Sequence, residues 1–179
     1  GLLELYRASQ NPVWLRWAVQ LTETQIRLFH DPDGGGFFDG AGDTALPVRL
    51  KGGYDGAEPA GNSLAAMNLY QLGTLTDNEK WIEMSRATLA SFASSLNDQP
   101  RALPQMLCAW QQTQAKPRQV VIAGPPGRED TVSLMATVFS LYDPGRIVLL
   151  AESGVNQQFL AASLPFLNQM GMIDGKATA

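Results

Sequence analysis

The stretch from Lys51 to Leu72 constrains the fold of this chain more than any other. It reads KGGYDGAEPAGNSLAAMNLYQL, in which a loop punctuated by glycine and proline leads into a run of mostly apolar residues. Glycine and proline at this density exclude a helix or a strand in the first half, and Asn62 or Ser63 is expected to cap the helix that follows. A helix that is apolar on nearly every side must be surrounded by other elements. The sequence therefore predicts a polar loop at the start of a buried helix, and we expect that start to open into a cavity.

Amphipathic helices are expected on both sides of this stretch. Pro12 suits the first position of a helix that ends before the HDPDGGG turn. Its apolar positions recur at three-and-four spacing, at Val13, Trp17, Leu21, Thr24 and Leu28. Residues 2–9 before it read as the last turns of a helix, so we expect the chain to be a fragment of a longer protein.

A capping box, Thr76 to Glu79, predicts the start of an outer helix. The apolar stripe of that helix consists of Ile82, Ser85, Leu89, Phe92 and Leu96. A shorter buried helix is expected next, with Pro104 in its first turn. Its apolar positions are Leu103, Met106, Leu107 and Trp110.

The periodicity changes after residue 116. Residues 120–123 and 147–150 are short apolar runs rich in β-branched residues, and residues 129–142 between them have a helical pattern. This order predicts a β-α-β unit with parallel strands, followed by a further helix over residues 157–167. The turn 124–127, GPPG, lacks both the G-x-G-x-x-G and the P-loop patterns, so we interpret it as a connection.

Composition limits the function classes. The 179 residues are 45% hydrophobic and 17% charged, with a net charge of -4 and a single cysteine. Neither sign of charge forms a long block, which argues against a nucleic-acid or membrane partner. One cysteine excludes an internal disulfide framework and a zinc site with several thiolates. No apolar run reaches the roughly 20 residues that cross a bilayer, so we expect a soluble protein of the cytoplasm.

Several motifs together resemble the C-terminal part of the thioredoxin-domain-containing family that includes spermatogenesis-associated protein 20 and the bacterial YyaL-type proteins. They are GGFFD (35–39), RLKGGYDGAEPAGNS (49–63), the following AAMNLYQL, RQVVIAG (118–124) and DGKATA (174–179). The resemblance covers essentially the whole chain. It implies a mainly α fold in which residues 1–116 form part of an (α/α) toroid of antiparallel helix hairpins, similar to the six-hairpin glycosidases. Residues 117–179 would then form a small C-terminal α/β unit.

The resemblance also implies where a ligand would bind. A toroid of this kind places its cavity at the loops that feed the inner helices, so the residues expected on its rim are Asp39, Lys51, Tyr54, Asp55, Glu58 and Asn62. Sugar hydrolysis needs two carboxylates, and Asp55 and Glu58 are the candidates for catalysis. Asp39, Lys51, Tyr54 and Asn62 are the candidates for substrate binding. The alternative is that Asp55 stabilises its own turn while Glu58 is solvated.

Other chemistry-bearing residues have structural interpretations. The single histidine, His30, lies at a helix end, where the helix dipole favours a cation. Cys108 is expected to be a small core residue. The aromatic pair Phe37 and Phe38 is expected to fasten the loop to the core in preference to stacking on a sugar. No metal or cofactor is expected.

Two classes of function follow. In the first, the full-length protein binds or converts a sugar, as a glycosidase-like or epimerase-like toroid, and this fragment alone is inactive. In the second, the segment is a non-catalytic scaffold or interaction domain of a redox-regulatory protein. In both, the expected partners are the thioredoxin-like and toroid portions of the same protein. A fragment that lacks them is expected to self-associate, because apolar helix faces are left uncovered.

Overall fold

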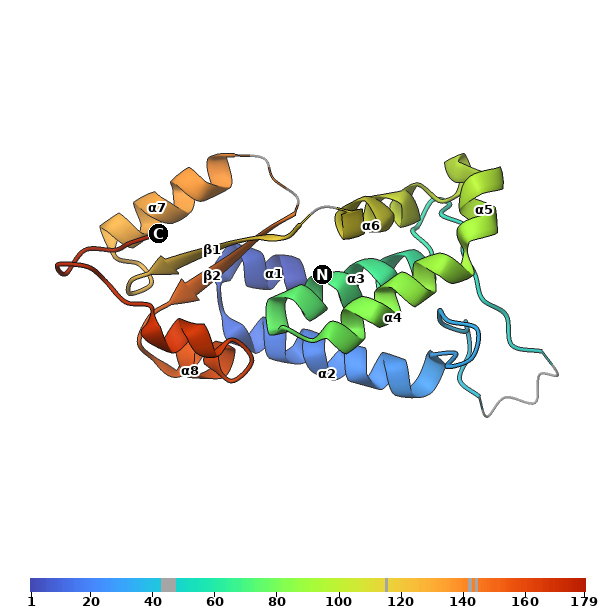
Figure 1. Ribbon diagram of the computed structural model, residues 1–179, viewed down its shortest axis with the longest axis horizontal. Coiled ribbons are helices and arrows are strands. Elements are labelled where there is room, and N and C mark those ends of the chain that lie inside the picture. The colour runs from blue at the N-terminus through green and yellow to red at the C-terminus, as the bar shows by residue number, and fades with distance from the viewer. Residues whose placement is uncertain (43–47, 115, 142, 144) are drawn as a thin grey trace. The chain divides into compact units, whose positions relative to one another are not determined.

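The computed structural model describes residues 1–42, 48–114, 116–141, 143 and 145–179, with the side chains of residues 155 and 156 outside the description. Contacts group residues 19–115 into one compact unit and residues 1–18 with 116–179 into another. The described residues are mainly helical with a small parallel sheet, which confirms the predicted mainly α class with its β-α-β unit (Figure 1). The domain limits 1–116 and 117–179 stay a prediction.

A helix hairpin is the centre of the helical unit. Helix α3 (Gly61–Thr76) and helix α4 (Glu79–Ser91) pack along each other, and α6 (Pro104–Gln114) packs on α3 as well (Figure 1). Gly73 permits the close approach within the hairpin, since a Cβ atom there would lie 2.7 Å from the Cγ1 atom of Ile82. One apolar core cluster of this unit consists of Ala66, Leu89, Leu103, Met106 and Ala109.

Helix α3 is buried along most of its length, as its all-round apolar sequence predicts. Its start differs from the prediction, because the N-cap residue is Ala60 and no side chain caps the helix. The capping box predicted for α4 is wrong as well. Thr76 is the last residue of α3, and the Asn78 side chain accepts the hydrogen bond from the Trp81 N–H at 3.3 Å.

The outer helix breaks once and then reverses into α6. Phe92 separates α4 from the short helix α5 (Ala93–Asp98), and a 3₁₀ turn (Pro100–Ala102) leads into α6. Pro104 begins α6, as predicted. The expected burial of α6 holds for Met106 but not for Trp110, which is 49% exposed, nor for Cys108, which is also exposed.

Helix α1 (Leu2–Ser9) and helix α2 (Pro12–Phe29) begin the chain where the sequence predicts helices. The apolar stripe predicted for α2 is exposed to solvent, with exposed fractions of 51% for Trp17 and 61% for Leu21. A second line of residues along α2 is buried instead and includes Leu15, Ala18 and Thr22. The helix thus has two apolar faces, and the periodicity alone could not say which one is covered.

The predicted β-α-β unit is present. Strand β1 (Arg118–Ala123) and strand β2 (Arg146–Ala151) pair in parallel, and helix α7 (Glu129–Ser140) connects them. Helix α8 (Val155–Ala161) ends earlier than the sequence suggested, and a 3₁₀ turn follows at Pro165–Gln169. Near the end of the chain, the Thr178 backbone exchanges hydrogen bonds of 2.8 and 3.1 Å with Ala123, so the tail extends the edge of β1.

Candidate functional site

The loop before α3 is held by the buried carboxylate of Asp55, which is 8% exposed. Its Oδ1 atom accepts a 2.8 Å hydrogen bond from the N–H of Ala60, within its own turn. Its Oδ2 atom accepts bonds of 2.9 and 3.1 Å from the N–H groups of Gln105 and Met106 in the first turn of α6. The first N–H groups of a helix have no partner within that helix, so Asp55 caps α6 from outside its own segment. Its backbone N–H also donates to the Ala102 carbonyl at 2.8 Å.

Asn62 fastens two further segments to the first turn of α3 and is 1% exposed. Its Oδ1 atom accepts a 2.7 Å hydrogen bond from the Phe37 N–H. Its Nδ2 atom donates to the carbonyls of Phe37 at 2.9 Å and Gly52 at 2.8 Å. All of these bonds are to backbone groups, so the side chain serves as a tie between loops. Phe37 itself is 3% exposed, in agreement with a role in fastening the loop to the core.

Lys51 pairs with Asp31, and its Nζ atom also donates to the Gly35 carbonyl at 2.7 Å. The hydrogen bond from Lys51 is the main cause that lowers the pKa of Asp31 to about 2, and the backbone N–H of Gly34 adds to it. His30 lies beside this pair, and partial burial lowers the pKa of its imidazole. Burial therefore disfavours the cation that the helix-end position of His30 led us to expect.

Asp39 is a fourth anchor of the loop. Its Oδ1 atom accepts a 2.9 Å hydrogen bond from the Gly52 N–H, and its own N–H donates to the Leu50 carbonyl at 2.8 Å. Arg49 lies over the neighbouring Phe38 ring, with its guanidinium carbon 3.9 Å from the ring centroid. Asp39 thus joins the segments before and after residues 43–47, which lie outside the described residues.

Tyr54 and Glu58 differ from the other candidates because both side chains are exposed, Tyr54 at 73%. Tyr54 lines a hollow of about 320 Å³ together with Lys51, at the side of α5. Gly53 lies in the wall, where a Cβ atom would come within 2.5 Å of the Phe92 ring. The remaining residues that line the hollow are Phe92, Ser94, Ser95, Asp98, Gln99, Ala102 and Leu103.

Of the six predicted site residues, Lys51 and Tyr54 line this hollow together. Asp39, Asp55 and Asn62 are engaged with backbone groups, and Glu58 is on the surface. The sequence reasoning missed the polar residues that α5 and the residue after it supply to the hollow, namely Ser94, Ser95, Asp98 and Gln99. The signal that could have found them is the run of polar residues before Pro100.

Among the described residues, no group of three or more histidine, cysteine, aspartate or glutamate side chains is placed to hold a metal ion. Within the same residues, no helix has the length and apolar character needed to span a bilayer.

These features define a class: a mainly α segment whose helices are joined by a loop with a buried, helix-capping carboxylate. No family model matches the chain. The chain is 40% identical to spermatogenesis-associated protein 20 of Mus musculus over 99% of its length, 41% identical to that of Rattus norvegicus over 99%, and 40% identical to that of Homo sapiens over 100%. The chain belongs to the spermatogenesis-associated protein 20 family. It spans 23% of the length of these curated relatives.

Proposed function

We propose that this segment is a non-catalytic scaffold within a full-length protein of the spermatogenesis-associated protein 20 family. One observation carries the proposal. The buried Asp55 carboxylate accepts three hydrogen bonds, from the backbone N–H groups of Ala60, Gln105 and Met106. Hydrogen bonds to a charged group are among the stronger ones in proteins, and leaving helix N–H groups unpaired is costly. Asp55 is best suited to joining the loop before α3 to the first turn of α6.

The scaffold proposal assigns any thiol redox chemistry to a portion outside this chain. The chain has one cysteine, Cys108, and a dithiol–disulfide couple needs two. The toroid arrangement of the hairpins is part of the same proposal, since α3 and α4 supply one hairpin and the other hairpins would come from the longer protein.

The test compares Asp55→Asn with Glu58→Gln in the full-length protein. Both substitutions replace a carboxylate by an amide of similar size. The scaffold proposal expects Asp55→Asn to lower the melting temperature and Glu58→Gln to leave it unchanged, because Glu58 is exposed. Equal melting temperatures for both variants, with sugar turnover lost in each, would favour the catalytic pair instead.

A second candidate is the binding of a saccharide by the full-length protein, in the hollow beside Tyr54. It is favoured by the lining, which combines the largely exposed Tyr54 ring with the hydroxyl, carboxylate and amide groups of Ser95, Asp98 and Gln99. Aromatic faces and planar polar side chains are the groups that orient small polar ligands in pockets. Asp55 does not line this hollow, so the proposal concerns saccharide binding alone. Hydrolysis or epimerisation of a sugar stays a separate prediction.

The saccharide proposal is tested with Tyr54→Ala in the full-length protein. Neutral mono- and oligosaccharides are titrated and followed by ligand-detected NMR. The expected result is a loss of binding by Tyr54→Ala at unchanged melting temperature, with Glu58→Ala as the surface control. Absence of binding by the unsubstituted protein across the sugar panel would remove this candidate.

A further inference from the structure

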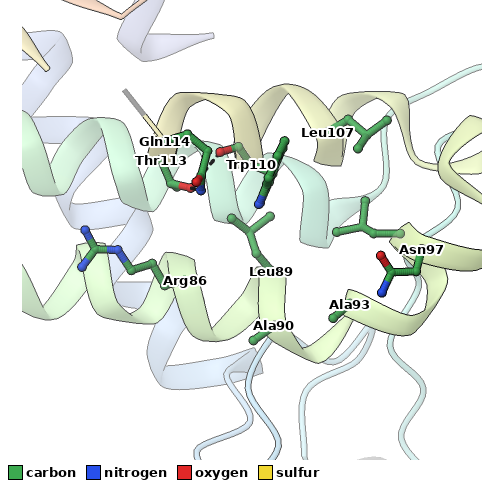
Figure 2. A pocket seen from close by; sticks show the side chains of 10 residues that line it. Arg86, Leu89, Ala90, Ala93, Asn97, Leu107, Trp110, Thr113 and Gln114 are labelled. Carbon is green, nitrogen blue, oxygen red and sulfur yellow. Dashed lines mark hydrogen bonds between the residues drawn. The ribbon is translucent and has the colours of Figure 1, made fainter. Parts of the chain in front are cut away.

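An apolar groove lies between α4, α5 and α6, and it has a volume of about 440 Å³ (Figure 2). Trp110 on α6 and Leu89 on α4 point toward one another across it (Figure 2). The other residues that line it are Arg86, Ala90, Ala93, Leu96, Asn97, Leu107, Thr113 and Gln114. The groove is separate from the hollow beside Tyr54, because the two share no lining residue.

The walls of the groove favour a helix as the occupant. Trp110, which is 49% exposed, forms one side of the groove. The small side chains of Ala90 and Ala93 form the opposite side, where another backbone can approach closely. Exposed apolar surface that surrounds a hollow is typical of a contact with another protein segment. Grooves between two helices receive amphipathic helices that insert apolar residues at three-and-four spacing.

We infer that this groove docks an amphipathic helix from the portion of the full-length protein that lies outside this chain. The matched segment is 23% of the length of the curated relatives, so more than three quarters of each relative lies outside it. A helix on the same polypeptide is held near the groove at a high effective concentration, which a second copy in dilute solution lacks. The inference concerns a different surface from the Asp55 cap and does not depend on it.

The charge at the rim defines the chemistry of the docked helix further. Arg86 lies at the rim and forms an ion pair with Glu79 at 3.4 Å, between two exposed side chains. Exposed pairs of this kind contribute little stability, so the guanidinium can exchange partners. The docked helix should therefore carry an aspartate or glutamate that contacts Arg86, next to its apolar stripe.

The test is site-specific photo-crosslinking in the full-length protein. Leu107→p-benzoylphenylalanine places the photoreactive group in the groove, and Gln111→p-benzoylphenylalanine places it on the exposed face of the same helix, outside the groove. The expected result is a crosslink from position 107 to one helical peptide outside residues 1–179 of the same polypeptide, with a yield that does not change over a tenfold dilution. Position 111 should not yield that peptide.

A groove-filling variant provides the second readout. Ala90→Trp occupies the space that the docked helix would fill, and it should reduce the crosslink of position 107 at least fivefold. Ala90→Ser, which keeps the residue small, should leave the crosslink unchanged. A crosslink between two copies that falls on dilution would overturn the inference in favour of self-association, and an absence of any crosslink from position 107 would overturn it outright.

Discussion

The Oδ2 atom of Asp55 accepts a 2.9 Å hydrogen bond from the backbone N–H of Gln105, which lies 50 positions further along the chain. This bond joins the loop before α3 to the first turn of α6, so the loop and the helix should open together. In Asp55→Ala, the amides of Gln105 and Met106 lose their acceptor, and we expect their hydrogen exchange to be roughly tenfold faster or more. Native-state exchange on the full-length protein measures this, with the central α6 amide of Trp110 as the internal reference.

Asn62 provides a second test, because its buried amide donates to two backbone carbonyls. Asn62→Asp places a carboxylate against the oxygens of Phe37 and Gly52, and removes the donor that both require. We expect a loss of about 3 kcal/mol or more, since a buried charge without a partner is strongly destabilising. The matched control is Asn68→Asp, an exposed position of the same helix, which should change stability by less than about 0.5 kcal/mol. Chemical denaturation monitored by tryptophan fluorescence compares the two, and similar midpoints would contradict the assigned role.

The pair of Asp31 and Lys51 predicts a pH dependence. The pKa of Asp31 is lowered to about 2 in the folded state, chiefly by the hydrogen bond from Lys51, against an ordinary value of about 4. A carboxyl whose pKa is lowered on folding stabilises the protein above its unfolded pKa. This stabilisation is lost as the pH falls from about 4 toward 2. In Lys51→Met, the Asp31 titration seen by carboxyl-carbon NMR should move toward about 4. An unchanged midpoint would show that Lys51 is not the cause.

Gly124, at the end of β1, tests packing in the α/β unit. A Cβ atom there would lie 2.4 Å from the Thr131 Oγ1 atom and 3.1 Å from the Ala177 Cβ atom. Gly124→Ala is expected to cost about 1 to 3 kcal/mol, because a methyl group is forced into filled space. Gly171→Ala is the control, since open space surrounds that position and the cost should stay below about 0.5 kcal/mol. Thermal unfolding of both variants distinguishes them.

The local elements could be predicted from the sequence because their signals lie within a few residues. Pro12 and Pro104 begin helices as expected, and the apolar β-branched runs form two parallel strands around α7. The all-round apolar character of α3 likewise predicted its burial. In each case the decisive interaction is a backbone preference or a side-chain period of two or about four residues.

The partners of these elements are decided by tertiary structure. Nothing near Asp55 in the sequence indicates that its carboxylate accepts hydrogen bonds from the first turn of α6. Likewise, nothing in the sequence of α2 indicates that Leu15 is buried while Trp17 is exposed. The cap of α4 depends on where α3 ends, so Asn78 takes the place that the motif assigned to Thr76. Hydrogen-bond partners that are far apart in the chain leave no local sequence pattern, because they meet only when the packing of the helices brings them together. Local patterns along the chain therefore specify which segments become helices and strands, whereas long-range packing makes Asp55 and Asn62 the ties between them.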